Sequence, residues 1–428
     1  MTGGREPPTE LMVGDERAQQ AVIGVATAAR MGSGILMGTA LAVYVGERGT
    51  PFAVSMVLAA YFLGLTVFAP VWGAIADVTG RRRAVLVLTG VLATAAIVPL
   101  GFTDGVWLPI GLRWLYAVFA AGYPPVLLSI MSVRGGDAGR GRSIGFYNSA
   151  RASGFTAGQL VAGALLGALA PAGVAAAIAL ASLASTLAAA LVFDPTPSPE
   201  EPPTIEELAG EIRRRLLPTA EDRAHLRNHG LGWLYVALAI RNMTVLGVAS
   251  LTAPYLLSNV GVTTAVMGLV LAINPAGQTV FMYLFGRVAD TAGRKPLIVA
   301  GMLGSGGYAL LMAGATLPGT VPVRAVVAAG ALVVLGAAYS SMTTGALAFI
   351  GDVVPTVREG EMMGLRSTAK GVGGVVGPPL IGSVATVTSY QAAFALASLL
   401  AVAAAAIAAV SLRESRPADA GVSFSPGD

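Results

Sequence analysis

The segment Gly73-Ala-Ile-Ala-Asp77-Val-Thr-Gly80-Arg81-Arg82 decides the architecture, because a second copy of its pattern stands 213 residues later. That copy is Gly286-Arg-Val-Ala-Asp290-Thr-Ala-Gly293-Arg294-Lys295. Both copies fit Gly-x-x-x-Asp-x-x-Gly-Arg followed by Arg or Lys, and each follows a long apolar stretch. A pattern repeated at half the chain length indicates two similar halves.

Residue spacing elsewhere supports this duplication. Arg30 and Arg241 stand 211 residues apart, each well inside an apolar stretch. The segment GFYNSARASG at 145–154 resembles GLRSTAKGVG at 364–373. Parallel repeats of six spans, related by an axis along the membrane normal, are typical of one class of membrane transporters.

Composition excludes most soluble classes of protein. The chain has 428 residues, 55% hydrophobic and 12% charged, and its mean hydropathy is +0.72. Soluble domains carry about 25% charged residues, so we exclude an ordinary cytosolic enzyme, a disordered protein and a nucleic-acid binder. The absence of cysteine excludes disulfides, zinc fingers and thiol catalysis. The composition therefore predicts a polytopic membrane protein.

Apolar runs long enough to cross a hydrocarbon core of about 30 Å as helices recur along the chain. We predict an all-α membrane protein with twelve transmembrane helices in two pseudo-symmetric six-helix bundles. The first six spans are expected at 20–46, 52–74, 84–103, 106–133, 143–169 and 172–194. The other six are expected at 231–258, 262–286, 296–317, 322–350, 362–386 and 390–412.

Basic residues predict the orientation. With both termini in the cytoplasm, 19 of the 27 Lys and Arg residues fall in cytoplasmic segments, and one, Arg48, falls in an external loop. This bias follows the positive-inside rule and predicts a multi-pass protein of the plasma membrane. The expected parts are a cytoplasmic tail (1–19), an N-terminal bundle (20–194), a cytoplasmic linker (195–230), a C-terminal bundle (231–412) and a cytoplasmic tail (413–428).

The linker carries its own helix signal. Thr204-Ile-Glu-Glu207 is a capping box, which predicts the start of a short amphipathic helix. Arg213, Arg214 and Arg215 follow, and they suit a helix end at the interface with anionic headgroups.

The repeated pattern resembles motif A of the major facilitator superfamily, which lies between spans two and three and again between spans eight and nine. The resemblance covers residues 20–412. In its general look the chain is similar to the drug-efflux branch of the superfamily. The resemblance implies a central cavity that opens alternately to each side of the membrane. It also implies a cytoplasmic gate, with close approach at the first glycine of each copy and charged partners at Asp352 for the second copy and Asp137 for the first. The alternative is that these charges are solvated and serve only to set the membrane topology by the positive-inside rule. The gate residues are Gly73, Asp77, Gly80, Arg81, Arg82, Gly286, Asp290, Gly293, Arg294 and Lys295.

Spaced glycines also occur in spans five and eleven. Gly154-x-x-x-Gly158 and Gly373-x-x-x-Gly377 resemble motif C of the antiporters, although the first copy lacks the expected proline. Small residues at this spacing allow helices to approach closely in lipid. We interpret them as close-packing positions between the bundles.

Several basic residues lie inside predicted spans, where a charge costs several kcal/mol unless it has a partner or faces a cavity. Arg30 and Arg241 fall near the midplane, Arg151 and Lys370 lie in spans five and eleven, and Arg113 lies nearer the outer face. No Asp or Glu falls in the interior of a span. An anionic substrate would satisfy a planar guanidinium well. The alternative is that these groups are structural and bond to helix carbonyls, water and aromatic faces.

Arginines in spans one and seven also resemble those of the organophosphate–phosphate antiporters of this superfamily. Other polar side chains in the spans could contact a solute. Those we select as candidates are Tyr123, Asn242, Asn274, Gln278 and Tyr339.

The leading functional hypothesis is a secondary active transporter that moves a small organic solute, anionic or neutral, by alternating access. A proton-coupled multidrug efflux pump is the main alternative, and a transporter-like solute sensor is a remote one. The spans lack the Asp, Glu, His and Cys of an intramembrane enzyme, so we expect no enzyme, cofactor, metal or nucleic acid. The expected partners are the solute, the lipid bilayer and either H⁺ or a counter-transported anion, with the monomer as functional unit.

Overall fold

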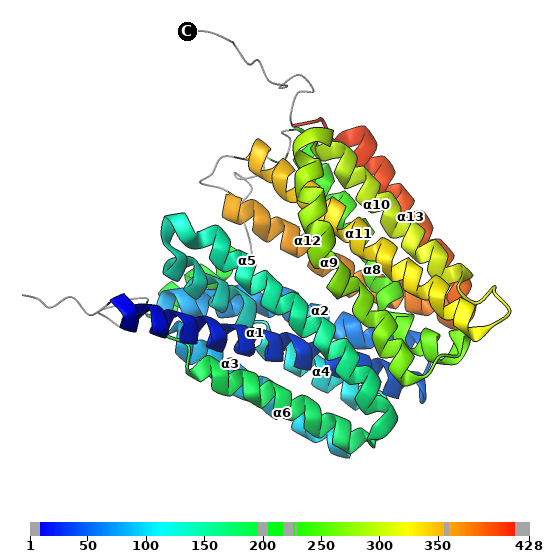
Figure 1. Ribbon diagram of the computed structural model, residues 1–428, viewed down its shortest axis with the longest axis horizontal. Helices are drawn as coiled ribbons and strands as arrows, with labels where there is room; N and C mark the ends of the chain where they lie inside the picture. Colours follow the sequence, from blue (N-terminus) through cyan, green and yellow to red (C-terminus); the bar gives the residue numbers. More distant parts are fainter. Residues whose placement is uncertain (1–8, 196–203, 217–225, 227–228, 355–358, 416–428) are drawn as a thin grey trace, which may run out of the picture. The chain divides into compact units, whose positions relative to one another are not determined.

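The computed structural model describes residues 9–195, 204–216, 226, 229–354 and 359–415, and within these ranges the chain is helical and contains no strand (Figure 1). The first half contains α1 (Thr9–Gly46), α2 (Pro51–Thr79), α3 (Arg82–Ala95), η1 (Val98–Phe102), α4 (Trp107–Ala120), α5 (Tyr123–Ala168), α6 (Pro171–Ala190) and α7 (Ile205–Leu216). The second half contains α8 (Leu231–Tyr255), η3 (Leu256–Val260), α9 (Thr264–Ala292), α10 (Arg294–Gly314), α11 (Val321–Val353), α12 (Glu359–Val387) and α13 (Tyr390–Ser411).

Local sequence sets where several helices begin and end. Thr263 and Ser389 precede α9 and α13, and each side chain accepts a hydrogen bond from the backbone N–H three residues later. Gly80 ends α2 with φ of 62°, and Gly293 ends α9 with φ of 84°. Side chains with a Cβ rarely adopt such angles, so this turn explains why both copies of the repeated pattern need glycine there.

Ten segments of the described residues are long and apolar enough to cross a membrane. They match all the predicted spans except 143–169 and 362–386. Those two are helical, in α5 and α12, but they carry glycines and the basic residues Arg151 and Lys370, which lower their hydropathy. The fold class is the predicted all-helical membrane protein, whereas the count of twelve is not reproduced by length and hydropathy alone.

One predicted loop is helical. The sequence predicted a break between spans four and five at 134–142, but helical backbone continues through the whole of α5. This segment contains no proline, so each residue keeps its N–H donor and can continue the helical hydrogen-bond pattern. The break lies earlier, at Ala121 and Gly122, between α4 and α5.

The chain divides into two compact units. The first unit contains Met1–Leu41 and Val67–Leu217, and the second contains Ala42–Thr66 and Pro218–Asp428. In the second unit a glycine on α12 leaves room for a side chain of α2. A Cβ at Gly374 would lie 2.3 Å from Phe62 Cγ, which explains why this part of α2 groups with later helices.

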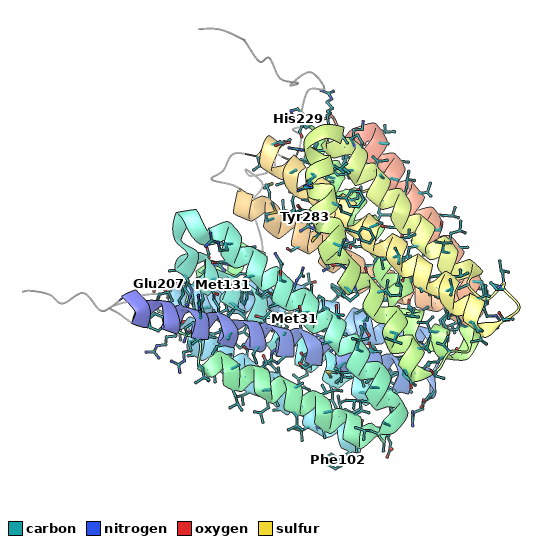
Figure 2. The ribbon with its side chains drawn as sticks, viewed as in Figure 1. Met31, Phe102, Met131, Glu207, His229 and Tyr283 are labelled. Atoms are coloured by element: carbon teal, nitrogen blue, oxygen red, sulfur yellow. The ribbon has the colours of Figure 1, made fainter. Side chains whose placement is uncertain are left out.

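In the first unit α3 packs against α4, α5 and α6. Leu86 of α3 and Leu127 and Ile130 of α5 are fully buried in its core. Trp72 Nε1 donates a 2.7 Å hydrogen bond to the carbonyl oxygen of Val118, which ties α2 to α4. Phe102, at the end of η1, is 86% exposed and points outward (Figure 2).

In the second unit α10 packs against α11 and α13, α8 packs against α12 and α13, and α9 packs against α11. Met302, Met342 and Phe349 are buried in its core. Tyr235 of α8 donates a 3.0 Å hydrogen bond to the carbonyl oxygen of Met362 on α12.

The spaced glycines lie at helix contacts inside each unit. A Cβ at Gly158 of α5 would lie 2.7 Å from the carbonyl oxygen of Gly32 on α1. A Cβ at Gly377 of α12 would lie 2.5 Å from Met243 Cα on α8. The expectation of close packing is met, but the expectation that these glycines pack between bundles is wrong, because each pair of helices belongs to one unit.

The linker contains the short helix α7, on which Figure 2 labels Glu207. Thr204 Oγ1 accepts a hydrogen bond from the Glu207 N–H at 3.2 Å, and Glu207 Oε2 accepts one from the Thr204 N–H at 2.9 Å. This reciprocal pair is a capping box, which satisfies two donors at the start of α7.

Candidate functional site

Arg30 lies on α1 in the first unit and is 3% exposed. Its Nη1 donates to Ser182 Oγ at 2.9 Å and its Nη2 donates to Thr186 Oγ1 at 3.1 Å, both on α6. The guanidinium carbon lies 5.5 Å from the ring centre of Tyr123. Its Nε has no hydrogen-bond partner among the described residues. Neutral hydroxyls and an aromatic face therefore hold this cation.

Arg241 lies on α8 in the second unit and is 1% exposed. Its Nε donates to Ser305 Oγ on α10 at 2.8 Å, and its Nη1 donates to Asn242 Oδ1 at 3.5 Å. The guanidinium carbon lies 5.7 Å from the ring centre of Tyr339. Within the described part of the chain its Nη2 has no hydrogen-bond partner. This cation, too, is held by neutral groups and an aromatic ring.

The hydroxyl partners of the two arginines were missed by sequence reasoning, which expected carbonyls, water and aromatic faces. Two signals pointed to them. Ser182 and Thr186 stand four residues apart and so share one face of α6. Ser305 stands 211 residues after Thr94, which is also the offset between Arg30 and Arg241. Thr94 Oγ1 lies 2.7 Å from Ser182 Oγ, so the residue equivalent to Ser305 in the first half belongs to the hydroxyl group around Arg30.

The other predicted basic residues lie beside aromatic rings, which attract cations. Arg113 on α4 is 3% exposed, and its guanidinium carbon is 5.4 Å from the ring centre of Tyr116. Arg151 on α5 is half-buried and 5.7 Å from the ring centre of Phe155. Lys370 on α12 is exposed, with its Nζ 5.9 Å from a phenylalanine ring centre.

The predicted amide side chains make local hydrogen bonds. Gln278 Nε2 donates to Asn274 Oδ1 at 3.2 Å, one turn away on α9. Asn242 Nδ2 donates to the carbonyl oxygen of Leu238 at 2.7 Å, which orients the amide oxygen that accepts from Arg241. Of these three amides, Asn242 is the one that contacts a buried arginine.

The first copy of the repeated pattern forms ion pairs within the first unit. Asp77 Oδ1 accepts from Arg82 Nη2 at 3.2 Å, and Asp77 Oδ2 accepts from Arg215 Nη2 on α7 at 2.9 Å. Arg215 was not predicted as a partner. A Cβ at Gly73 would lie 3.0 Å from Arg215 Nη1, so this glycine does allow a close approach. The side chain of the expected partner, Asp137, lies outside the described residues.

The second copy pairs with the expected acid. Arg294 Nε donates to Asp352 Oδ2 at 3.1 Å. At Gly286 the structure shows no such close approach, because a Cβ there would meet no atom of the described residues within 4 Å. The side chain of Asp290 lies outside the described residues, and the backbone N–H of Lys295 donates to Glu414.

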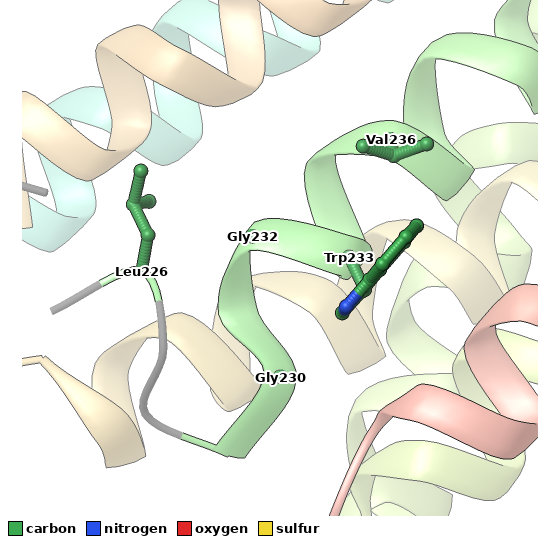
Figure 3. Close-up of a pocket in the computed structure, with 5 residues that line it drawn as sticks. All are labelled: Leu226, Gly230, Gly232, Trp233 and Val236. Atoms are coloured by element: carbon green, nitrogen blue, oxygen red, sulfur yellow. The ribbon is translucent and has the colours of Figure 1, made fainter. Parts of the chain in front are cut away.

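A hollow at the start of α8 contains none of these residues. Leu226, Gly230, Gly232, Trp233 and Val236 line it, and none of the five is ionisable (Figure 3). The described residues that line it therefore offer no charged contact for a solute.

The family model described as Major Facilitator Superfamily matches residues 22–252 and 235–427. The chain belongs to the Major Facilitator Superfamily. The repeated pattern is therefore motif A of this superfamily, in both of its expected copies. The two overlapping matches agree with the internal repeat read from the sequence.

Solved structures of transporters share the fold. A variant of the nucleoside transporter NupG aligns with a TM-score of 0.74 at 12% identity, over 92% of this chain and 99% of that chain. A bacterial homolog of the human lysosomal transporter Spinster aligns with 0.66 at 15%, over 92% and 95%. The peptide transporter POT in complex with sulfate aligns with 0.71 at 13%, over 91% and 93%. A comparison with curated proteins finds no match.

The chain is thus a multi-pass membrane protein with a transporter fold of the Major Facilitator Superfamily. Its structural neighbours are named for different solutes, and at these identities they establish the fold alone. The solute must be inferred from the side chains of this chain, because one fold carries many functions.

Proposed function

We propose that this member of the superfamily is a secondary active transporter that moves a small organic anion by alternating access, with Arg30 and Arg241 as its charged contacts. One observation carries the proposal. Two buried guanidinium groups occupy equivalent positions of the repeat. Within the described residues their partners are neutral, and one nitrogen of each has no hydrogen-bond partner.

The energetics favour an anion over a cation or a purely apolar solute. A buried guanidinium without a counter-charge costs several kcal/mol in a low-dielectric interior. A carboxylate or phosphate offers several acceptors to a planar guanidinium and forms strong charge-assisted hydrogen bonds. Bound at these groups, it would offset that cost, whereas a lipophilic cation would be repelled.

Coupling to a second anion is preferred to coupling to protons in this proposal. No Asp, Glu or His lies in the interior of a predicted span, so the spans lack a carboxylate or imidazole that could titrate during transport. We place the protein in the plasma membrane with both termini in the cytoplasm, as a functional monomer, on the basis of the charge bias and the repeated bundles.

The test is a ligand-induced thermal-shift screen on the purified protein in detergent. The probes are inorganic phosphate, phosphorylated and carboxylated metabolites, neutral sugars and lipophilic cations. Anions should raise the Tm, and in Arg30→Gln and Arg241→Gln their Kd should rise about 10- to 100-fold, the loss expected for a charge-assisted hydrogen bond.

The controls separate binding from folding. Arg48→Gln removes an exposed arginine that pairs with Glu47, and it should bind anions like the parent. Arg30→Lys and Arg241→Lys keep the charge but lose the planar fork, so they serve if a glutamine variant does not fold. Stabilisation by neutral amphipaths, unchanged in the double glutamine variant, would overturn the anion proposal and favour drug efflux instead.

A further inference from the structure

In each unit, motif A is contacted by the polar chain that follows the last predicted span of its half. Arg215 belongs to the linker after α6, and it contacts the first copy of motif A. Glu414 belongs to the tail after α13, and it contacts the second copy. Neither residue is part of motif A or of a predicted span.

In the first unit both carboxylate oxygens of Asp77 are occupied. Oδ1 accepts from Arg82, which lies in the same motif, and Oδ2 accepts from Arg215 of α7. Glu211, one turn earlier on α7, accepts from Arg215 Nε at 2.7 Å and so orients the guanidinium toward Asp77. Arg215 is the exchangeable partner, because Arg82 lies only five residues from Asp77 in the chain.

Arg215 keeps its charge at every working pH. Burial lowers its pKa, but its hydrogen bonds to Glu211 and Asp77 raise the pKa more, and the net direction is upward from the ordinary value. Any release of this contact therefore comes from competition by another charged group or from salt, since the arginine does not deprotonate.

In the second unit the tail supplies an acid to the start of α10. Glu414 Oε1 accepts from the backbone N–H of Arg294 at 2.9 Å, and Oε2 accepts from that of Lys295 at 3.1 Å. A carboxylate there is favoured by the helix dipole. Gly293 makes the approach possible, since a Cβ on it would lie 2.9 Å from Glu414 Oε2.

The same tail also reaches the partner acid of the motif. Ser415 Oγ donates to Asp352 Oδ2 at 2.9 Å, the oxygen that also accepts from Arg294 Nε at 3.1 Å. The backbone N–H of Arg413 donates to the carbonyl oxygen of His229, labelled in Figure 2, at 3.0 Å. The tail is thus fixed on both sides of Glu414.

We propose that Arg215 and Glu414 are positioning residues of the cytoplasmic gate, each holding motif A of its own half in a closed set of contacts. The inference rests on the proposed alternating-access function and names a regulation of it. While Arg215 pairs with Asp77, it competes with any group outside the unit for that carboxylate. The linker and the tail therefore set the fraction of molecules in which motif A is free to act as a gate.

The ion pair between Arg215 and Asp77 is weak enough to break and re-form. The Arg215 side chain is 32% exposed and that of Asp77 is 39% exposed, so water and salt screen the pair. Pairs of this kind change an equilibrium by up to about fivefold. A stronger contact would fix the gate in one state.

The experiment measures gate opening without a solute. Because the chain contains no cysteine, Arg83→Cys at the start of α3 and Ala292→Cys at the end of α9 can carry spin labels without a background signal. Both positions are exposed. Distance distributions between the labels, recorded in lipid nanodiscs at low and high salt, report the populations of closed and open cytoplasmic gates.

Arg215→Gln and Glu414→Gln should each change the ratio of the two populations by about two- to fivefold, with a smaller effect at high salt. Arg215→Lys should restore most of the parent ratio. Arg214→Gln is the matched control on α7, because Arg214 pairs with Glu211 and is 77% exposed. Arg413→Gln is the control in the tail, because its hydrogen bond comes from the backbone.

Hydrogen exchange separates the outcomes. Glu414→Gln should speed exchange of the Arg294 and Lys295 amides, which shows that the contact has been lost. Lost contacts with an unchanged population ratio would overturn the inference, because the linker and tail would then be structural only. A parent protein with one population under all conditions would count against alternating access, and so against the proposed function itself.

Discussion

Arg30 on α1 and Ser182 on α6 are joined by a 2.9 Å hydrogen bond from Nη1 to Oγ, with both side chains buried. A hydroxyl fixes the guanidinium in place but leaves its full positive charge uncompensated. Arg241 and Ser305 repeat this arrangement in the second unit, with Nε as the donor. Each unit thus holds a buried cation positioned by a hydroxyl, and an anion site needs charges positioned in this way.

The serine that holds Arg30 should matter for stability. Ser182→Ala leaves a buried guanidinium N–H without its acceptor, at a cost of about 1–3 kcal/mol in the free energy of unfolding. The Tm in detergent should fall accordingly. Ser153→Ala, at an exposed position of α5, should leave the Tm unchanged. Equal Tm values for the two variants would argue that the hydroxyl contributes nothing to holding Arg30.

The equivalent change in the second unit tests whether the two buried arginines depend on their serine partners to the same extent. Ser305→Ala removes the acceptor of Arg241 Nε and should also cost about 1–3 kcal/mol. An anion that binds Arg241 should recover part of the lost Tm, since it supplies new acceptors. Thermal shift with and without inorganic phosphate measures both effects, and a deficit that phosphate leaves unaltered would contradict anion binding at Arg241.

The carboxylate of motif A should affect rate more than folding. Asp77→Asn keeps the size of the side chain but weakens both ion pairs, to Arg82 and Arg215. We expect slower exchange of an anion found by the screen in proteoliposomes, with little change in Tm because these pairs are partly exposed. Asp104→Asn, in an exposed loop, is the control. Unchanged turnover in Asp77→Asn would remove the gating role.

Replacing a glycine should lower stability where the glycine lies at a helix contact, and should not do so elsewhere on the same helix. Gly377→Ala places a Cβ 2.5 Å from Met243 Cα, so α12 and α8 must separate. Overpacking of this kind costs about 1–3 kcal/mol. Gly364→Ala lies on the same helix, and its Cβ would meet no atom of the described residues within 4 Å. Thermal unfolding of the two variants should differ in this order, and a reversed order would refute the close contact.

The capping box should determine how well α7 is formed. Thr204→Ala removes the acceptor for the Glu207 N–H and should destabilise this short helix by about 1 kcal/mol. Faster hydrogen exchange confined to residues 205–216 is the expected result. Exchange that stays at the parent rate would mean that the contact of Arg215 with Asp77, rather than the cap, keeps α7 folded.

Much of the fold was predictable because its signals are local or periodic. Hydropathy runs indicate membrane helices, and Thr204 with Glu207 marks the start of α7 from four residues of sequence. The same reasoning was wrong at 134–142, where the glycine and arginine residues predicted a loop. The segment is helical in α5, because local sequence could not tell a polar helix from a polar turn.

The candidate site was predictable only in part. Arg30 and Arg241 were found because a charge in an apolar run is conspicuous and because both recur at one offset. Their partners on α6 and α10 were not found, since serine and threonine are common in membrane helices and carry no charge signal. Arg215 was assigned to the membrane interface, although its guanidinium also reaches Asp77, 138 residues away.

The sequence by itself determined the class of protein, the internal repeat, motif A and the two arginines. These follow from composition and spacing, which are properties of the chain alone. The tertiary structure decided which groups satisfy those charges, and it brought the linker and the tail onto motif A. Such contacts join residues far apart in the chain, 152 positions for Arg30 and Ser182 and 64 for Arg241 and Ser305. Only the packing of helices determines which of these side chains come within hydrogen-bond distance.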